Sequence, residues 1–566
     1  MKYFGAIDQG TTSSRFIVFN ESGEIVEQHQ QEHMQILPDE HSVEHNANEI
    51  WESVKTCIKV VDCKFNIEQL TSIGITNQRE TTVAWNKLTG EPLYNALVWQ
   101  DTRTQSICDE LSSNKNLTQE FNKTGLPIAT YFSLSKILWL IRNVPEVEKN
   151  LEINNVCFGT IDSWLIFKLT GEHLTDVTNA SRTLLLNIET GKWSEKILET
   201  LDIPITSLPK IKPSLSNFGT NNQILKNVPI TAVLGDQQAS LFGHNCLSKG
   251  EIKNTYGTGC FALTNTGEEI IYSNNGLLTT IAYQIEDLPI QYAVEGSVSI
   301  AGAAVQWLRD NLNIIKESSE IESLAMKVKD NGDVYFVPAF SGLFSPHWDE
   351  TARGVLVGLS RFSNKSHIAR AVLESVAYQS FELLQSMEKD VGFVFESVNV
   401  DGGMVENNLL MQFQSDIFDK KVVSQEINEI TALGVGAASF LHINKMPFEN
   451  MKDFITQSKT WNPNIDSKLR DHYLNKWNKA ISKAVSYSGI GTIDKVFGLI
   501  FGIFKSYVLI VCLFTAANIV YNYDKWPFNL KDSFTFPWVE KGSKYLIKEF
   551  PNEKQYQDAK EKVQDI

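Results

Sequence analysis

The sequence of 566 residues predicts an α/β protein with two domains of related design and an appended hydrophobic helix near its C-terminus. Three observations carry this prediction. Short apolar runs alternate with helical patterns up to about residue 245, the same alternation resumes in the second half, and a long apolar run follows at 496–520. We therefore expect one domain at residues 1–248, a second at 249–486 and a tail at 487–566.

Composition and charge narrow the classes of function. The chain is 42% hydrophobic and 21% charged, as globular proteins are, and its net charge of −16 makes nucleic acid an unfavourable partner. The seven cysteines are odd in number and form no C-x-x-C pair, which argues against a disulfide framework or a zinc site. Because no basic segment followed by an apolar one opens the chain, we expect catalytic domains in the cytoplasm.

The first domain opens with an antiparallel meander. Three apolar runs, at Tyr3–Ile7, Phe16–Phe19 and Ile25–Gln28, are strand-like, and residues 20–23 are typical of a hairpin turn. A polar loop at residues 8–15 joins the first two strands.

That polar loop is the first candidate for chemistry. Gly10 allows close approach of backbone amides to a ligand, the hydroxyls of the loop can donate to phosphate oxygens, and Asp8 at the strand end can hold Mg²⁺ through water. These are the requirements of a nucleotide phosphate site. An ordinary polar hairpin loop is the alternative, because Gly, Thr and Ser are common in turns. No G-x-x-x-x-G-K-[ST] motif is present, so a different fold must hold any nucleotide.

Two glycine turns mark the second domain. Residues 256–260 contain one, and residues 401–403 lead from the strand-like 397–400 into a helical pattern at 406–418. Together with the hydroxyl-rich loop of the first domain, these turns suggest a nucleotide clamped in a cleft between the domains.

Charged residues follow two apolar runs. The run at 72–76 leads into Arg79 and Glu80, and the run at 228–234 leads into Asp236. Ligands of open α/β sheets lie beyond the carboxyl ends of strands, so these side chains are placed where a substrate could lie. Solvated loop charge is the alternative. Adjacent Arg and Glu can bind vicinal hydroxyls, and a single Asp can accept a hydroxyl proton.

One motif is discounted. Residues 41–45 fit H-x-x-E-H, an inverted zinc-peptidase pattern. Three fixed positions arise easily by chance, and Pro38 just before them favours a loop over a metal-binding helix.

Seven motifs, in order and at the expected spacing, resemble those of glycerol kinases within the wider carbohydrate kinases of actin-like and hexokinase-like fold. They lie at residues 8–15, 77–82, 159–165, 178–183, 235–239, 254–261 and 401–408. The likeness covers residues 1 to about 485. It implies two ribonuclease-H-like domains that close around ATP, Mg²⁺ and a polyol, and a homo-oligomer.

The resemblance also implies roles for individual residues. Asp236 would be the general base for the attacking hydroxyl of glycerol. The implied glycerol-binding residues are Arg79, Glu80, Trp99, Tyr131, Asp236, Gln237 and Phe261. The implied nucleotide-binding residues are Thr11, Thr12, Ser13, Arg15, Thr258, Gly302, Gln306, Gly403 and Asn407, with Asp8 near the metal.

Alternatives and one departure remain. A sister kinase for a pentulose or a sugar acid is the nearest rival, and Arg79–Glu80 with Trp99 favours glycerol. A catalytically idle, membrane-attached scaffold is the other, and the presence of Asp8 and Asp236 argues against it. Bacterial relatives regulated by fructose 1,6-bisphosphate carry a glycine-rich loop with an arginine where this chain has Asn221–Asn227, so we expect no such inhibition.

The tail has no counterpart in the kinases. Its apolar run at 496–520 spans 25 residues, enough to cross a membrane, although Lys505 interrupts it. A helix buried against the kinase is the alternative. Residues 488–502 resemble the last membrane segment of the colicin V production protein family. Four lysines at 476–495 against two at 521–540 place the kinase on the cytoplasmic side, tethered to the inner face of the cell membrane.

Overall fold

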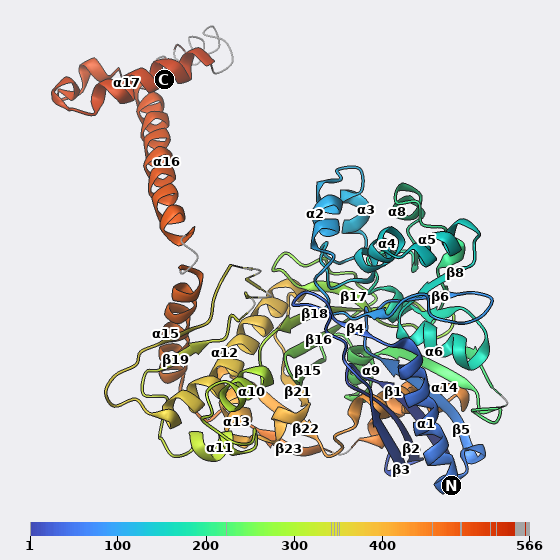
Figure 1. Ribbon diagram of the computed structural model, residues 1–566. Coiled ribbons are helices and arrows are strands. Elements are labelled where there is room, and N and C mark those ends of the chain that lie inside the picture. Colours follow the sequence, from blue (N-terminus) through green and yellow to red (C-terminus); the bar gives the residue numbers. More distant parts are fainter. Residues whose placement is uncertain are drawn as a thin grey trace. The chain divides into compact units, whose positions relative to one another are not determined.

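The structure is a computed structural model that describes residues 2–221, 223–340, 342–343, 346–347, 349, 351–455, 457–486, 490–520, 522–527, 529–549 and 561. It divides into two compact units (Figure 1). The first comprises residues 1–350 with 354–481 and holds both large sheets. The second comprises residues 351–353 with 482–566.

The first large sheet has the strand order β13-β14-β5-β1-β2-β3. Its strands are β1 (Tyr3–Gln9), β2 (Ser13–Asn20), β3 (Ile25–Glu32), β5 (Leu70–Asn77), β13 (Leu215–Gly219) and β14 (Ile230–Gly235). β1, β2 and β3 pair antiparallel, which confirms the predicted meander. β5 pairs parallel with both β1 and β14, so the ends of these three strands lie at one edge.

Two helices cover opposite faces of this sheet. Helix α1 (Ala47–Phe65) packs over Ile7, Phe16 and Ile75, whereas α14 (Ile430–Ile443) packs over the residues that alternate with them, such as Ala6 and Ile17. Gly74 allows α14 to lie close, because a Cβ there would stand 2.3 Å from the Val435 carbonyl oxygen. A helix from the second half of the chain therefore completes the core of the first sheet.

The second large sheet repeats the design, in the order β17-β18-β16-β15-β21-β22-β23. β15 pairs antiparallel with β16 and parallel with β21, as β1 pairs with β2 and β5. The predicted two related domains of an actin-like and hexokinase-like fold are thereby confirmed. The strands are β15 (Ile252–Tyr256), β16 (Cys260–Gly267), β17 (Leu278–Tyr283), β18 (Gln291–Val298), β21 (Ser397–Asp401), β22 (Lys421–Gln425) and β23 (Gln457–Trp461).

Helices α12 (Lys365–Val391) and α13 (Asn408–Phe418) pack against this sheet, and α10 (Gly302–Asp310) packs against α12. Where the sequence predicts one helical stretch from 406, a 3₁₀ turn at Gly403–Glu406 comes first and α13 begins at Asn408. The reason is a cap: the Asn407 side chain accepts a hydrogen bond from the Leu410 amide at 2.8 Å.

Smaller elements fill the connections. Between β3 and β14 these are β4 (Glu44–His45), β6 (Val83–Asn86), β7 (Ala96–Leu97), α2 (Gln105–Ser113), α3 (Thr118–Asn122), α4 (Ser133–Asn143), α5 (Pro145–Glu152), β8 (Val156–Gly159), α6 (Ile161–Thr170), β9 (Leu174–Asp176), α7 (Val177–Ala180), β10 (Leu186–Asn187), β11 (Lys192–Trp193), α8 (Glu195–Thr200) and β12 (Lys210–Lys212). Later come α9 (Asp236–Gly243), α11 (Glu320–Ala325), β19 (Tyr335–Val337), β20 (Val355–Val357) and α15 (Ser467–Ser486).

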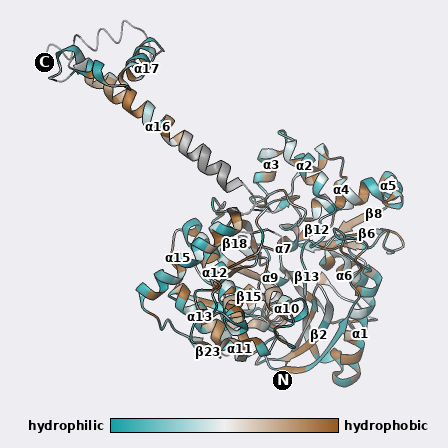
Figure 2. Ribbon diagram, turned by 60° about the vertical axis from the view of Figure 1, so that its left-hand side comes forward, coloured by the Kyte–Doolittle hydropathy of each residue, from teal (hydrophilic) through white to brown (hydrophobic). Residues whose placement is uncertain are grey.

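The second unit contains the predicted hydrophobic helix. Helix α16 runs from Ile490 to Val520, so it begins earlier than the apolar run at 496–520. Helix α17 (Phe536–Glu549) packs against it, with hydrogen bonds from the Tyr507 hydroxyl to the Trp538 carbonyl at 3.0 Å and between the Thr515 and Ser543 hydroxyls at 2.8 Å. In Figure 2, brown, hydrophobic residues predominate in the coloured part of α16, whereas α17 carries both teal, hydrophilic residues and brown ones.

Candidate active site

Arg79 and Asp236 meet where two parallel strands end. Arg79 follows β5, and Asp236 is the first residue of α9, directly after β14. Because β5 and β14 are neighbours, the Arg79 Nε lies 3.1 Å from the Asp236 Oδ1. Gly235 makes room, since a Cβ there would stand 2.7 Å from Arg79 Cδ. The Asp236 side chain is 33% exposed, whereas that of Arg79 is 2% exposed, so the carboxylate faces open space and the guanidinium does not.

Three aromatic side chains form a group near Arg79, since the Trp99 amide donates to the hydroxyl of Thr81, two residues after Arg79, at 3.2 Å. The ring centroid of Trp99 lies 5.6 Å from that of Tyr131 and 6.5 Å from that of Phe261. The Trp99 indole N–H donates to the Thr11 hydroxyl at 3.1 Å, which links the aromatic group to the loop between β1 and β2. The predicted polyol residues and one predicted phosphate residue are thus neighbours.

Two buried charged residues without a predicted role join the polyol group. Glu295 on β18 accepts hydrogen bonds from Arg79 Nη1 and Nη2 at 2.6 and 2.8 Å. Arg182 donates from Nε to the Glu80 carboxylate at 2.6 Å. Arg182 stands in one of the sequence motifs, but only tertiary contacts reveal its role. No sequence pattern around Glu295 indicates a role in this site, because Glu295 reaches the site from β18 of the second large sheet.

Lys253 on β15 is a third residue that sequence reasoning missed. Its side chain is buried and donates to the Gln237 side-chain oxygen, to the Thr255 hydroxyl at 2.9 Å and to the Phe261 carbonyl at 3.3 Å. Burial lowers the pKa of Lys253 to about 8, although Asp401 and Glu295 oppose that shift. Since Lys253 binds the Gln237 oxygen, the Gln237 amide can turn its N–H donors elsewhere. The sequence feature that could have indicated Lys253 is its position just before the glycine turn at residues 256–260.

The phosphate-loop candidates surround Gly10, whose amide donates to the Ser13 carbonyl at 2.9 Å. Thr12 is exposed, and Ser13 is buried. Arg15 donates to Glu429 at 2.8 Å and lies 3.6 Å from Asp8. Arg15 is therefore held by carboxylates at the end of the loop.

Asp8 is the predicted metal-binding residue. Burial raises the pKa of Asp8 to about 7 against the opposing effect of Arg15, and Glu429 and Asp236 raise it further. A buried carboxyl group that is costly to ionise is stabilised in its charged form by a bound cation. Among the described residues, no group of three or more His, Cys, Asp or Glu is arranged to hold a metal ion by itself. The donors present therefore fit a Mg²⁺ ion that nucleotide phosphates and water help to coordinate.

The nucleotide-side candidates come from three segments in contact. The Gly302 amide at the start of α10 donates to the Gly257 carbonyl at 3.0 Å, and the Ala301 amide donates to that of Thr258 at 2.9 Å. Gly402 has φ +94°, and a Cβ there would stand 2.4 Å from the Tyr256 carbonyl oxygen. The two predicted glycine turns are thus packed together at the edge of the second sheet.

The remaining predicted residues take positions around these turns. Gln306 lies four residues after Gly302 in α10, so the two residues lie on the same face of that helix. Gly403 has no atom within 4 Å of a hypothetical Cβ, so its surroundings are open. Asn407 caps α13. The structure therefore brings Thr258, Gly302, Gly403 and their neighbours into one region.

The discounted H-x-x-E-H residues have structural partners. Glu44 is buried and accepts from Tyr94 and Asn95 at 3.1 and 2.8 Å and pairs with Arg103 at 2.7 Å. Burial lowers the pKa of His45 to about 3.

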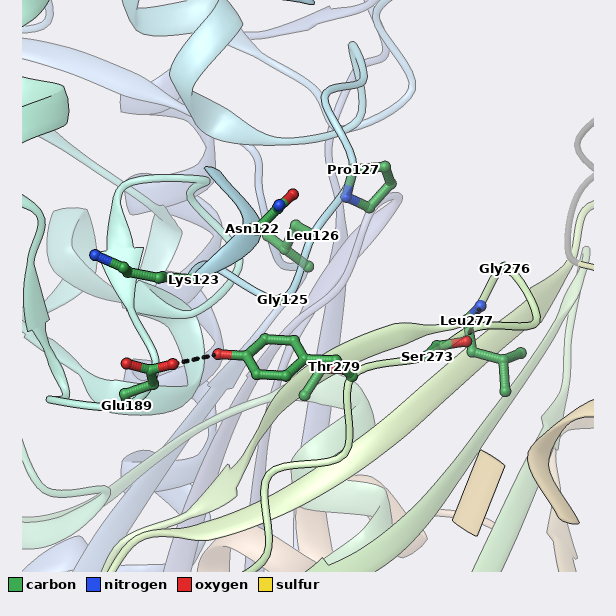
Figure 3. Close-up of a pocket in the computed structure, with 11 residues that line it drawn as sticks. Asn122, Lys123, Gly125, Leu126, Pro127, Glu189, Ser273, Gly276, Leu277 and Thr279 are labelled. Atoms are coloured by element: carbon green, nitrogen blue, oxygen red, sulfur yellow. Dashed lines mark hydrogen bonds between the residues drawn. The ribbon is translucent and has the colours of Figure 1, made fainter. Parts of the chain in front are cut away.

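A pocket of about 640 Å³ lies apart from these residues (Figure 3). None of the predicted site residues lines it. Its polar side chains pair locally: Tyr272 donates to Glu189 at 2.9 Å, and Lys123 pairs with Glu120 at 2.8 Å. The lining residues are Asn122, Lys123, Gly125, Leu126, Pro127, Glu189, Tyr272, Ser273, Gly276, Leu277 and Thr279.

Comparison with known proteins agrees with this geometry. Residues 3–243 match the N-terminal domain and residues 252–440 the C-terminal domain of the FGGY family of carbohydrate kinases. Residues 476–544 match the colicin V production protein family, which confirms the resemblance noted in the tail sequence.

Individual relatives extend the likeness. A glycerol kinase of Brucella anthropi is 49% identical over 497 residues, which cover 86% of this chain and 99% of that protein. A glycerol kinase of Chloroflexus aggregans is also 49% identical, with the same coverage. A crystal structure of Plasmodium falciparum glycerol kinase with ADP superposes with a TM-score of 0.81 at 37% identity, covering 86% of this chain and 98% of that one. From the matched domains and these relatives, the chain belongs to the FGGY family of carbohydrate kinases.

Proposed function

We propose that this protein is an ATP-dependent glycerol kinase, which transfers the γ-phosphate of ATP to glycerol and yields sn-glycerol 3-phosphate and ADP. One observation carries the proposal: Arg79, Glu80, Asp236 and an aromatic group of Trp99, Tyr131 and Phe261 converge next to the loop that holds Thr11. Hydroxyls need paired donors and acceptors, and a short carbon chain needs an apolar wall. This set provides both for a small polyol.

Asp236 acts as the general base. Its partly exposed carboxylate can accept the proton of the attacking hydroxyl, while Arg79 at 3.1 Å fixes its orientation. Phosphoryl transfer depends mainly on alignment and on stabilisation of charge, so a weak base at the right place is sufficient. Trp99, Tyr131 and Phe261 exclude water from the carbon side of the substrate.

The nucleotide lies between the two sheets in this proposal. Thr11, Thr12, Ser13 and Arg15 bind its phosphates, and Thr258, Gly302, Gln306, Gly403 and Asn407 contact it from the second sheet. Mg²⁺ with Asp8 neutralises charge on the phosphates when it is bound. Arg15 must exchange part of its contact with Glu429 for a phosphate oxygen, which is an exchange of one anion for another.

Substrate identity can be tested directly. The purified full chain is assayed for ADP release with glycerol, xylulose, ribulose and gluconate at equal concentrations. We expect glycerol to give the highest kcat/KM. A preference for a pentulose or for gluconate would assign the chain to a sister activity, and no ADP release with any of the four would favour the idle scaffold.

We also propose that the tail tethers the kinase to the inner face of the cell membrane. Among the described residues, one helix is long and apolar enough to cross a membrane by length and composition, over Phe501–Asn518. Exposed apolar side chains lie on every side of it: Phe501, Ile503, Phe504, Val508, Leu509, Ile510 and Leu513. Lys505 lies within this span, and its long side chain can extend the amine toward the membrane surface.

Helix α17 supports the same proposal. Trp538, Lys541, Tyr545 and Lys548 follow a spacing of three, four and three residues, so they share one face, and all four are exposed. Aromatic rings with lysines are typical of the level of lipid headgroups. We therefore expect α16 to enter the apolar layer and α17 to lie at its surface.

Cell fractionation tests the tether. The full chain should sediment with membranes and resist extraction by carbonate, whereas a chain ended after Val485 should be soluble and retain glycerol-dependent ATP turnover. Release by carbonate would limit the tail to a surface attachment. Full-length protein in the soluble fraction, or a truncated chain that does not fold, would show that the tail belongs to the kinase core.

The family resemblance further supports a homo-oligomer, which light scattering of the truncated chain can test.

A further inference from the structure

Four buried charged side chains of alternating sign, Arg79, Glu295, Arg182 and Glu80, contact one another at the proposed polyol site. Arg79 and Glu80 are adjacent in the chain, yet the Arg79 Nε lies 3.9 Å from the Glu80 carboxylate, and each side chain makes its short contacts elsewhere. Arg79 pairs with Glu295 through two hydrogen bonds of 2.6 and 2.8 Å, and Glu80 pairs with Arg182 at 2.6 Å. Arg182 also donates to Glu295 at 3.2 Å, which completes the sequence Arg79, Glu295, Arg182, Glu80.

The members come from both halves of the first unit. Arg79 follows β5, Arg182 follows α7, and Glu295 lies on β18 of the second large sheet. The side chains of Arg79, Glu295 and Arg182 are 2%, 1% and 0% exposed. A single buried charge would be very costly, and alternating partners offset that cost. The second sheet therefore supplies the anion on which both arginines depend.

The electrostatics agree with this arrangement. Burial by itself would raise the pKa of Glu295, but Arg182 and Arg79 hold it at about 2. Glu295 therefore carries its negative charge throughout the physiological range of pH.

Arg182 is held on its other side by aromatic rings. Its guanidinium carbon lies 5.7 Å from the ring centroid of Tyr131 and 5.5 Å from that of Phe132. Arg182 thus contacts both Glu80 and Tyr131, two of the residues that we assign to the polyol. Its Nη1 is buried without a protein partner among the described residues, so packing as well as hydrogen bonding fixes its place.

We propose that Glu295 and Arg182 are positioning residues for polyol recognition. Without them, Arg79 and Glu80 would be free to pair with each other and would no longer offer separate donors and acceptors to the substrate. Glu295 acts through Arg79, whose Nε in turn orients Asp236. Arg182 acts through Glu80, of which it engages one carboxylate oxygen and leaves the other for a hydroxyl. This inference rests on the proposed glycerol kinase activity.

The test is the variant Glu295→Gln in the full chain, with steady-state kinetics for glycerol and for ATP. Glutamine has nearly the same shape but no charge, so one of the two Arg79 bonds is lost. We expect the KM for glycerol to rise by about 10- to 100-fold, in keeping with the cost of a misplaced binding group, while the KM for ATP changes by less than about threefold.

A control variant is available on α12, the helix that packs against the strand of Glu295. Glu374 on α12 is also buried, accepts from Arg370 at 2.8 Å and from Asn331 at 2.8 Å, and contacts none of the proposed site residues in these bonds. Glu374→Gln should therefore leave the KM for glycerol unchanged. An equal change of KM in both variants would show a general structural effect and overturn the proposal.

A second variant, Arg182→Lys, keeps the proposal testable if Glu295→Gln does not fold. Lysine retains the charge but cannot donate from Nε to Glu80 while it also reaches Glu295. We expect a raised KM for glycerol with an unchanged KM for ATP. A KM for glycerol equal to that of the unchanged chain in whichever variant folds would refute the positioning role. Absence of glycerol turnover in the unchanged chain would refute the proposed function instead.

Discussion

Asp236→Asn is the perturbation that bears most directly on the mechanism. Asparagine keeps the size of the side chain and one oxygen that Arg79 can contact, but it cannot take a proton from the substrate hydroxyl. A positioned general base contributes a rate factor on the order of 10²–10⁴, which equals about 2.7 to 5.4 kcal/mol of activation free energy. We expect kcat to fall by that factor.

The fold should survive this change. Asp236 occupies the first turn of α9, where a carboxylate stabilises a helix by about 0.3–1 kcal/mol. Arg79 retains its two bonds to Glu295, so no buried charge is left without a partner. The variant should therefore unfold within a few degrees of the unchanged chain and bind ADP with unchanged affinity.

The assay is ADP release at saturating glycerol and ATP, with thermal unfolding and ADP titration alongside. Glu195→Gln is the control, because Glu195 is an exposed carboxylate in the first turn of α8, outside the proposed site. It should show a small loss of stability and an unchanged kcat. Turnover by Asp236→Asn close to that of the unchanged chain would refute the general-base assignment.

Three further predictions concern regulation, pH and packing. Millimolar fructose 1,6-bisphosphate should leave activity unchanged, since residues 221–227 carry no arginine; inhibition that does not compete with ATP would contradict this. Burial, and after it the nearby Asp176, raise the pKa of Asp162 from 3.8 to about 7. The folded protein therefore favours protonated Asp162, and the stability that this group contributes is fully present below pH 3.8 and is lost as the pH rises through 7. The melting temperature of Asp162→Asn relative to the unchanged chain should therefore increase from pH 5 to pH 8, and a pH-independent difference would count against the shift. Gly434→Ala places a Cβ 2.0 Å from the Ala239 carbonyl oxygen and should lower the free energy of unfolding by about 1–3 kcal/mol, whereas Gly502→Ala, with no atom within 4 Å, should not.

The sequence alone determined the local features of this protein. The strands of the meander, the runs that end at Arg79 and Asp236 and the apolar helix are all confirmed, because each depends on periodicity or on turn chemistry within a short stretch. The ordered motifs also identified the family, since their spacing reflects one arrangement of strands. The assignments of individual residues to glycerol, nucleotide and metal, and the domain boundaries, remain predictions.

Only the tertiary structure decided which residues support the site from a distance. Glu295 lies 216 positions from Arg79 in the chain, and no pattern around either residue indicates that they meet. The same holds for α14, which lies between β22 and β23 of the second sheet in sequence but covers the first sheet. Such contacts depend on how two sheets pack, and packing selects partners by shape and charge in three dimensions, whereas sequence periodicity reports only which face of an element is buried.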